Sequence, residues 1–178
     1  PFGDSFSRSV KFNGTDSYAY VNRQDFRIFM PSVGLEAWFK LSALGSKQVI
    51  IARNDVRSVG GNEISMGVNA SNQLYVSRGN TTVLTAAQTL TTDVWYHVVF
   101  NAINFGGWIG AFYLNGEVDT PYTVLTGNTA FDGADKQWLI GRDGNGNFFN
   151  GYISNVAVYG LPLDPTDDVG QHYKSGTS

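Results

Sequence analysis

Three polar residues that alternate with glycine are the clearest candidates for chemistry in this sequence. Asp143, Asn145 and Asn147 stand at every second position of GRDGNGN (141–147). Carboxylate and amide oxygens at this spacing are ligands that Ca²⁺ accepts. The continuation FFNG (148–151) lacks the later glutamate of an EF-hand loop, which excludes that motif. Asn and Gly also tolerate left-handed backbone, so a metal-free turn is the competing interpretation.

The carboxylates and histidines form no recognisable catalytic set. Glycoside hydrolysis generally needs two carboxyl groups at one cleft, and alternate strand positions would place them on one face. In EISMGV (63–68) a serine, Ser65, stands where the second acid would be, and Glu36 has no alternating acidic partner. His97 and His172 are isolated from any serine or cysteine nucleophile motif. We therefore predict a hydrogen-bonded sheet histidine at 97, a solvated histidine at 172, and no enzymatic activity.

Composition favours strands and excludes several classes of partner. The 178 residues include 21 glycines and no cysteine, and the formal net charge is −3. Without cysteine there is no disulfide or thiolate metal site. The absence of a basic run gives nucleic acid little electrostatic support, and no apolar stretch approaches membrane-spanning length. The length suits one domain, which we predict over residues 1–178.

Short alternating runs separated by Gly, Asn, Asp and Ser predict an antiparallel sandwich or barrel. The predicted strands lie within residues 9–12, 18–21, 33–41, 47–53, 63–68, 73–78, 94–100, 108–118, 137–141 and 151–159. Two hairpin turns are predicted, at 69–72 and at Asn115-Gly116.

Period-two alternation also predicts which side chains share a face. In strand 33–41 the apolar face carries Leu35, Ala37, Phe39 and Leu41, and the opposite face carries Glu36, Trp38 and Lys40. In strand 151–159 one face carries Ile153, Ala157 and Tyr159, and the other carries Tyr152, Val156 and Val158.

One helix is predicted near the C-terminal end of the sequence. Asp164 can cap its first turn, and Pro165 suits the first helical position. Asp167 and Asp168 in the first turn and Lys174 near the last turn agree with the helix dipole.

Four segments in this order resemble the laminin G-like, concanavalin A-like lectin/glucanase jelly-roll superfamily. They are SVKFNGTDSYAYV (9–21), VGLEAWFKL (33–41), VWYHVVF (94–100) followed by AFYLNGEV (111–118), and WLIGRDGNGNFFNGYISNVAVYGLPLD (138–164). The resemblance implies an all-β, antiparallel two-sheet jelly roll with one short C-terminal helix. It also implies one Ca²⁺ at a rim, held by acids from separate loops; Asp16, Asp55 and Asp132 are loop acids that could join Asp143 and Asn145.

Sugar binding would need exposed aromatic rings beside planar polar groups. Trp38 and Trp95 match strand tryptophans of the family and are predicted to pack in the core or between the sheets. Trp108, Trp138 and Tyr122 lie next to predicted loops and are the predicted ligand-binding aromatics, with Phe148 a similar candidate. Arg53 and Asn54 begin a polar loop that could contact the same ligand, although a solvated turn explains them equally well.

Two functions remain open on this sequence. The first is a non-enzymatic extracellular module for adhesion that binds glycans or surface proteins, with one Ca²⁺ ordering its rim. The alternative is a structural, decoration or receptor-binding module of an extracellular assembly such as a virion capsid or fibre. Both place the protein outside the cell, at a cell surface or on a virion, without nucleic acid or membrane insertion.

Overall fold

The chain forms an all-β sandwich of two antiparallel sheets, as predicted. The computed structural model describes residues 8–21, 32–54, 62–104, 106–126 and 137–177. The strands are β1 (Val10–Asn13), β2 (Ala19–Val21), β3 (Ser32–Leu41), β4 (Gln48–Asn54), β5 (Asn62–Val68), β6 (Gln73–Arg78), β7 (Thr81–Thr89), β8 (Trp95–Asn104), β9 (Trp108–Leu114), β10 (Glu117–Val124), β11 (Gln137–Ile140) and β12 (Asn150–Tyr159).

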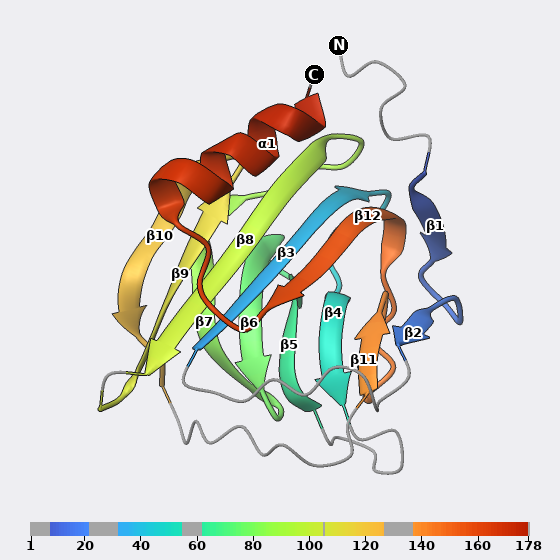
Figure 1. The fold of residues 1–178 in the computed structure, drawn as a ribbon. Coiled ribbons are helices and arrows are strands. Elements are labelled where there is room, and N and C mark those ends of the chain that lie inside the picture. Colours follow the sequence, from blue (N-terminus) through green and yellow to red (C-terminus); the bar gives the residue numbers. More distant parts are fainter. Residues whose placement is uncertain (1–7, 22–31, 55–61, 105, 127–136, 178) are drawn as a thin grey trace.

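The described residues form six strands in each sheet, and the two sheets lie face to face (Figure 1). The β3 sheet has the order β1-β12-β3-β8-β9-β10, and the β4 sheet has the order β2-β11-β4-β5-β6-β7. Neighbouring strands are antiparallel throughout, so sequence-distant strands such as β1 and β12 become direct partners. The predicted hairpin turn at Asn115-Gly116 is confirmed, because both residues have the positive φ (54° and 82°) of a primed turn.

The hydrophobic core fills the space between the sheets, where alternation predicted it. Leu35, Ala37, Phe39 and Leu41 of β3 are fully buried in this core. Strand β8 contributes Val98, Phe100 and Ala102 from the neighbouring position in the same sheet. The outer face of β3 therefore carries Glu36, Trp38 and Lys40, as predicted.

The face prediction for β12 is wrong in its second half, because a bulge interrupts the alternation. The pairing of β12 with β3 shifts between Ser154 and Ala157, and Asn155 adopts a left-handed φ of 49°. Ile153 before the bulge faces the core, whereas Ala157 and Tyr159 after it line the outer side of the sheet. The extra residue thus exchanges the two faces within one strand.

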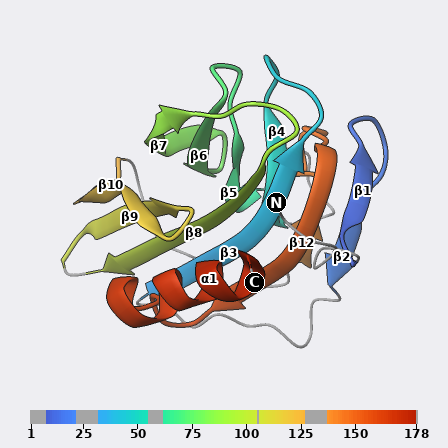
Figure 2. The ribbon, with the colours of Figure 1, turned by 90° about the horizontal axis from the view of Figure 1, so that it is seen from above.

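The helical end of the chain covers the outer face of the β3 sheet. A π-helical turn, η2 (Pro165–Val169), leads into α1 (Gly170–Thr177). Asp164 caps this segment as predicted, accepting hydrogen bonds from the backbone N–H groups of Thr166 and Asp167. In the view from above, α1 lies against β3, β8 and β12, with β4 to β7 behind that sheet (Figure 2).

Two contacts fix the segment that leads to the helix. The Asn101 side chain donates to the Leu163 carbonyl (2.8 Å) and accepts from the Leu163 N–H (3.0 Å). Leu163 and Val169 then complete a small apolar cluster with Val99 and Tyr113 on the outer face.

No helix in the described ranges is long and apolar enough to cross a membrane.

Substitution of Gly67 provides a test of the close approach between β4 and β5. A Cβ added at Gly67 would overlap the carbonyl of Gln48 on the paired strand. We expect Gly67→Ala to cost roughly 1–3 kcal/mol of unfolding free energy and to lower Tm by roughly 2 to 10 °C in calorimetry. Gly160→Ala is the matched control, because nothing lies within 4 Å of an added Cβ there. Equal Tm values for the two variants would contradict this packing.

Candidate functional site

The segment 141–149 is a loop that the Asp143 carboxylate organises from within. Asp143 is completely buried, and its Oδ1 accepts from the backbone N–H groups of Asn145 (2.9 Å) and Asn147 (3.1 Å). The Asn147 side-chain amide also donates to Oδ2 (2.9 Å). The Asn145 amide in turn donates to Asn80, beside the end of β6 (2.9 Å). The loop is therefore held by hydrogen bonds to protein groups.

In this geometry the candidate ligands of the predicted calcium site hydrogen-bond to protein groups. Both oxygens of Asp143 already accept hydrogen bonds, and the Asn145 amide points its N–H at Asn80. Asp16 accepts from the Asn13 side chain (2.7 Å) within its own exposed turn. Across the described ranges, no group of three or more His, Cys, Asp or Glu could hold a metal ion. Asp55 and Asp132 lie outside the described residues, so a wider rim site stays a prediction.

Two of the predicted ligand-binding aromatics are buried, and the prediction that they are exposed is wrong. Trp108 and Trp138 are each 4 % exposed and belong to the core between the sheets. Alternation along β9 and β11 directs both rings inward, although each stands near a loop. Tyr122 on β10 is 38 % exposed, as predicted, and burial raises its pKa, although a hydrogen bond with Asn101 works against that shift.

The predicted polar pair Arg53 and Asn54 is also buried. Arg53 is 3 % exposed and pairs across the sheet with Trp138 on β11. Asn54 is 1 % exposed and lies beneath Gly144, where an added Cβ would overlap its amide. The structure thus brings Asn54 next to the Asp143 loop, but beneath it rather than at its surface.

The exposed chemistry at this loop comes mostly from residues that the sequence reasoning did not single out; of these residues only Phe148 was a predicted candidate. Tyr18 and Tyr20 are 45 % and 61 % exposed, and their ring centroids lie 6.5 Å apart. The Arg142 guanidinium lies 4.5 Å from the centre of the Tyr18 ring and 5.5 Å from that of Phe148. We call Tyr18, Tyr20, Arg142 and Phe148 the Tyr18–Arg142 cluster.

Strand pairing explains how this cluster forms. Tyr20 of β2 is opposite Leu139 of β11, and the chain passes from the end of β11 through Gly141 to Arg142. The Arg142 Nε–H donates to the Asp143 carbonyl (3.1 Å), which anchors the guanidinium to the organised loop. Among the described residues, no carboxylate forms an ion pair with Arg142. The alternation in YAYV (18–21) was the available signal, since it places both tyrosines on one face.

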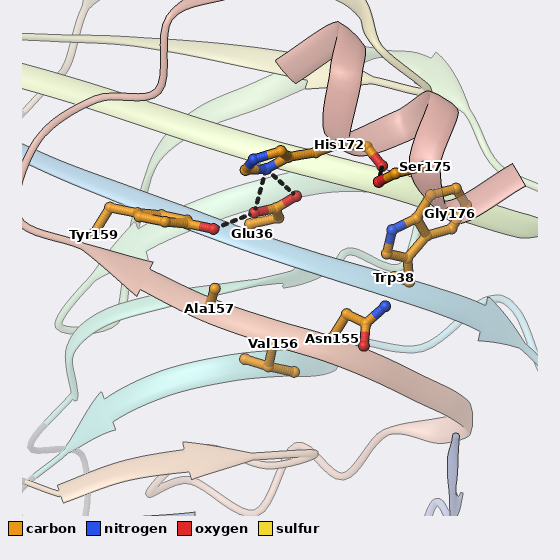
Figure 3. A pocket seen from close by; sticks show the side chains of 9 residues that line it. All are labelled: Glu36, Trp38, Asn155, Val156, Ala157, Tyr159, His172, Ser175 and Gly176. Atoms are coloured by element: carbon orange, nitrogen blue, oxygen red, sulfur yellow. Dashed lines mark hydrogen bonds and ion pairs between the residues drawn. The ribbon is translucent and has the colours of Figure 1, made fainter. Parts of the chain in front are cut away.

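A second polar cluster lies on the other sheet, beneath the terminal helix. A hollow of about 320 Å³ lies between α1 and β12. Figure 3 shows the Glu36 carboxylate among the side chains that line it. Tyr159 donates to Glu36 Oε2 (2.6 Å), and His172 Nδ1 lies 3.1 Å from each carboxylate oxygen. From the sheet below, His97 Nε2 lies 2.7 Å from Oε1.

The two histidines have different roles around Glu36. His97 is fully buried, with its Nε2 against the Glu36 carboxylate and no hydrogen-bond partner at its Nδ1. This confirms the predicted hydrogen-bonded sheet histidine. His172 is 39 % exposed at its side chain but contacts Glu36, so the prediction that it is merely solvated is wrong. His172 and Glu36 are 136 residues apart in the sequence, so no local pattern indicated this contact.

The environment of Glu36 keeps its carboxylate charged although it is 6 % exposed. Burial raises its pKa, but hydrogen bonds from His97 and Tyr159 and the charges of both histidines, when protonated, leave the pKa below the ordinary 4.5. Burial and the nearby carboxylate raise the pKa of Tyr159, which therefore stays a donor. Every close partner of this carboxylate is a donor, which suits a structural role in docking α1 better than acid catalysis.

These features define a lectin-like β-sandwich, and its family can be stated. The chain belongs to the Concanavalin A-like lectin/glucanases superfamily, since the Laminin_G_3 sequence profile of that superfamily matches residues 13–167. A search of curated protein sequences found no match.

Several solved structures share the fold at low sequence identity. A candidate carbohydrate-binding protein from Bacteroides ovatus ATCC 8483 aligns with a TM-score of 0.66 and 19% identity, over 90% of this chain and 46% of that one. A heptameric SAP-like pentraxin from Limulus polyphemus gives 0.69 and 15%, over 91% and 79%. Trypanosoma rangeli sialidase bound to the inhibitor DANA gives 0.63 and 18%, over 93% and 27%. This chain thus spans under half of the Bacteroides protein and about a quarter of the sialidase.

The lowered pKa of Glu36 predicts a pH dependence of stability. A carboxylate with a lower pKa in the folded state stabilises the fold above its unfolded value of 4.5, and this contribution is lost as the pH falls through the folded-state pKa. We expect the unfolding free energy from denaturant titrations to fall between about pH 5 and pH 3. The fall should be smaller in Glu36→Gln.

Tyr159→Phe provides a milder variant should the glutamine fail to fold. It removes one donor to the carboxylate and should shift the same acid transition to higher pH. Identical pH profiles in the wild type and both variants would show that Glu36 does not carry this dependence.

Proposed function

We propose that this protein is a non-enzymatic glycan-binding module and that the Tyr18–Arg142 cluster contacts the sugar. The observation that carries this proposal is the pair of exposed tyrosine rings beside a guanidinium fixed on an ordered loop. The carbohydrate-binding assignment of the Bacteroides protein that shares this fold supports the proposal.

The chemistry of the cluster suits a sugar ring. The apolar C–H face of a sugar stacks on an aromatic ring, and its hydroxyl groups need planar polar partners at the edge. Tyr20 supplies the most exposed ring of the cluster, and Arg142 supplies N–H donors beside it. Because the Asp143 carboxylate already orders the loop, little conformational entropy is lost on binding.

Two further parts of the proposal concern catalysis and calcium. The donors that surround Glu36 support a role other than hydrolysis, and in β5 Ser65 stands where a second acid would complete a strand pair. The internal hydrogen bonds of Asp143 support sugar binding without calcium at this loop. We further propose an extracellular or surface setting, where glycans are accessible.

A structural or decoration module of a larger assembly is the second candidate function. The observation that favours it is the edge strand β10, where Val118 and Val124 are 56 % and 71 % exposed. Such side chains on an edge strand suit a protein neighbour. Purified protein that stays monomeric at high concentration in analytical ultracentrifugation, and also binds glycan, would exclude self-assembly through this edge.

Substitution of Tyr20 tests the glycan-binding proposal. We expect Tyr20→Ala to weaken binding to the best ligand of a glycan array roughly three- to tenfold, because one stacking face is lost. Tyr20→Phe should retain binding, since the ring remains. Affinities would be measured by calorimetry in calcium and in EDTA, with equal values expected.

Arg142→Ala provides a second test, and Lys174→Ala is its matched control. Both changes remove one cation, but Lys174 is an exposed residue of α1, which covers the β3 sheet and not the sheet that contains β2. We expect only Arg142→Ala to weaken binding of the array ligand. A wild-type array without any ligand, in calcium and in EDTA, would overturn the proposed function.

A further inference from the structure

Four side chains form a straight row across the outer face of the β3 sheet. Lys11 of β1 is opposite Tyr152 of β12, Tyr152 is opposite Lys40 of β3, and Lys40 is opposite Trp95 of β8. Cations and aromatic rings therefore alternate from strand to strand. We call these four residues the Lys–aromatic row.

The rings hold the ammonium groups in place. Lys40 Nζ lies 4.7 Å from the centre of the Tyr152 ring and 5.6 Å from that of Trp95. Lys11 Nζ lies 5.8 Å from the centre of the same Tyr152 ring. A lysine side chain normally loses considerable rotamer freedom when it binds a ligand, and these cation–π contacts reduce that loss beforehand.

The row is a positive surface on a protein of net charge −3. Within the described ranges, neither Lys11 nor Lys40 forms an ion pair. Glu36, the acidic residue on the same face of β3, is committed to His97, Tyr159 and His172. The positive charges of the two ammonium groups are therefore available to bind an anionic ligand.

The row is separate from both clusters described above. Gly176 of α1 packs on Trp38, which precedes Lys40 by two positions on the outer face of β3. Lys40 itself is half-buried and Lys11 is exposed. The Lys–aromatic row therefore lies beside the part of the sheet that α1 covers. The Tyr18–Arg142 cluster belongs to the edge of the opposite sheet.

We propose that the Lys–aromatic row binds a linear acidic polysaccharide that runs across the strands. Neighbouring strands are about 4.8 Å apart, so two lysines on alternate strands present their charges about 10 Å apart in a straight line. An extended chain of acidic sugars repeats its charges along a line in the same way. The half-buried rings of Tyr152 and Trp95 add apolar surface for the sugar C–H groups between those charges.

The binding experiment compares polysaccharides that differ only in charge. Polygalacturonate and its carboxyl-reduced neutral counterpart test a carboxylate, and dextran sulfate and dextran test a sulfate ester. We expect the wild type to bind at least one acidic member and neither neutral one in calorimetry, and binding should weaken as salt rises. Equal binding of neutral and acidic members, or no binding of either acidic polymer, would overturn the proposal.

Substitutions then locate the site. We expect Lys40→Gln to weaken binding of the acidic polymer about tenfold and Lys11→Gln several-fold, with Lys40→Arg close to wild type. Lys47→Gln is the matched control, because Lys47 lies 4.9 Å from the Tyr75 ring on the other sheet. Unchanged binding in Lys40→Gln, or an equal loss in Lys47→Gln, would contradict the assignment to this row.

Two further measurements distinguish a polysaccharide from an acidic peptide, and this row from the Tyr18–Arg142 cluster. Oligo-glutamate should bind more weakly than the acidic polysaccharide, and tighter binding would instead assign the row to an acidic peptide. Tyr20→Ala should bind the acidic polymer as the wild type does, because Tyr20 lies on the other sheet. Failure of the Tyr18–Arg142 proposal would therefore leave this result unchanged, and the reverse also holds.

Discussion

The central strand β3 must bury apolar side chains on its inner face while it holds polar and aromatic side chains on its outer face. The rest of the structure depends on both sets of contacts. Its inner side chains, Leu35, Ala37, Phe39 and Leu41, supply the middle of the core. Its outer side chains are Glu36, Trp38 and Lys40. Glu36 and Trp38 contact the terminal helix, whereas Lys40 contacts the rings of Tyr152 and Trp95 on the two strands that pair with β3.

Glu36 and Trp38 together attach the terminal helix to the sheet. A carboxylate that is 6 % exposed would be costly without donors, and here the donors come from β8, β12 and α1 at once. Trp38 adds a parallel contact with the Tyr173 ring, whose centroid is 5.7 Å away. The polar contact fixes the register of the helix on the sheet, while the aromatic contact adds apolar area to the same interface.

The sequence predicted the fold well because periodicity and turn residues are local signals. The β3 faces, the Asn115-Gly116 turn and the Asp164 cap all follow from neighbouring residues. The binding surface was predicted less well, because exposure depends on which loop covers which strand. Asn54 is buried since Gly144 lies on it, and nothing near Asn54 in the sequence indicates this contact. The bulge at Asn155 likewise depends on pairing with β3 and has no clear local signature.

The pairing of β1 with β12 also has a consequence for how the protein folds during synthesis. Val10 is opposite Ile153, so strands separated by nearly the whole chain close one edge of the β3 sheet, and β12 lies between β1 and β3. A nascent chain that ends before β12 leaves the outer edge of β3 unpaired. Such a long loop must close before its contacts form, which favours slow folding after β12 leaves the ribosome. Until then, the unpaired edge of β3 is open to pairing with another chain.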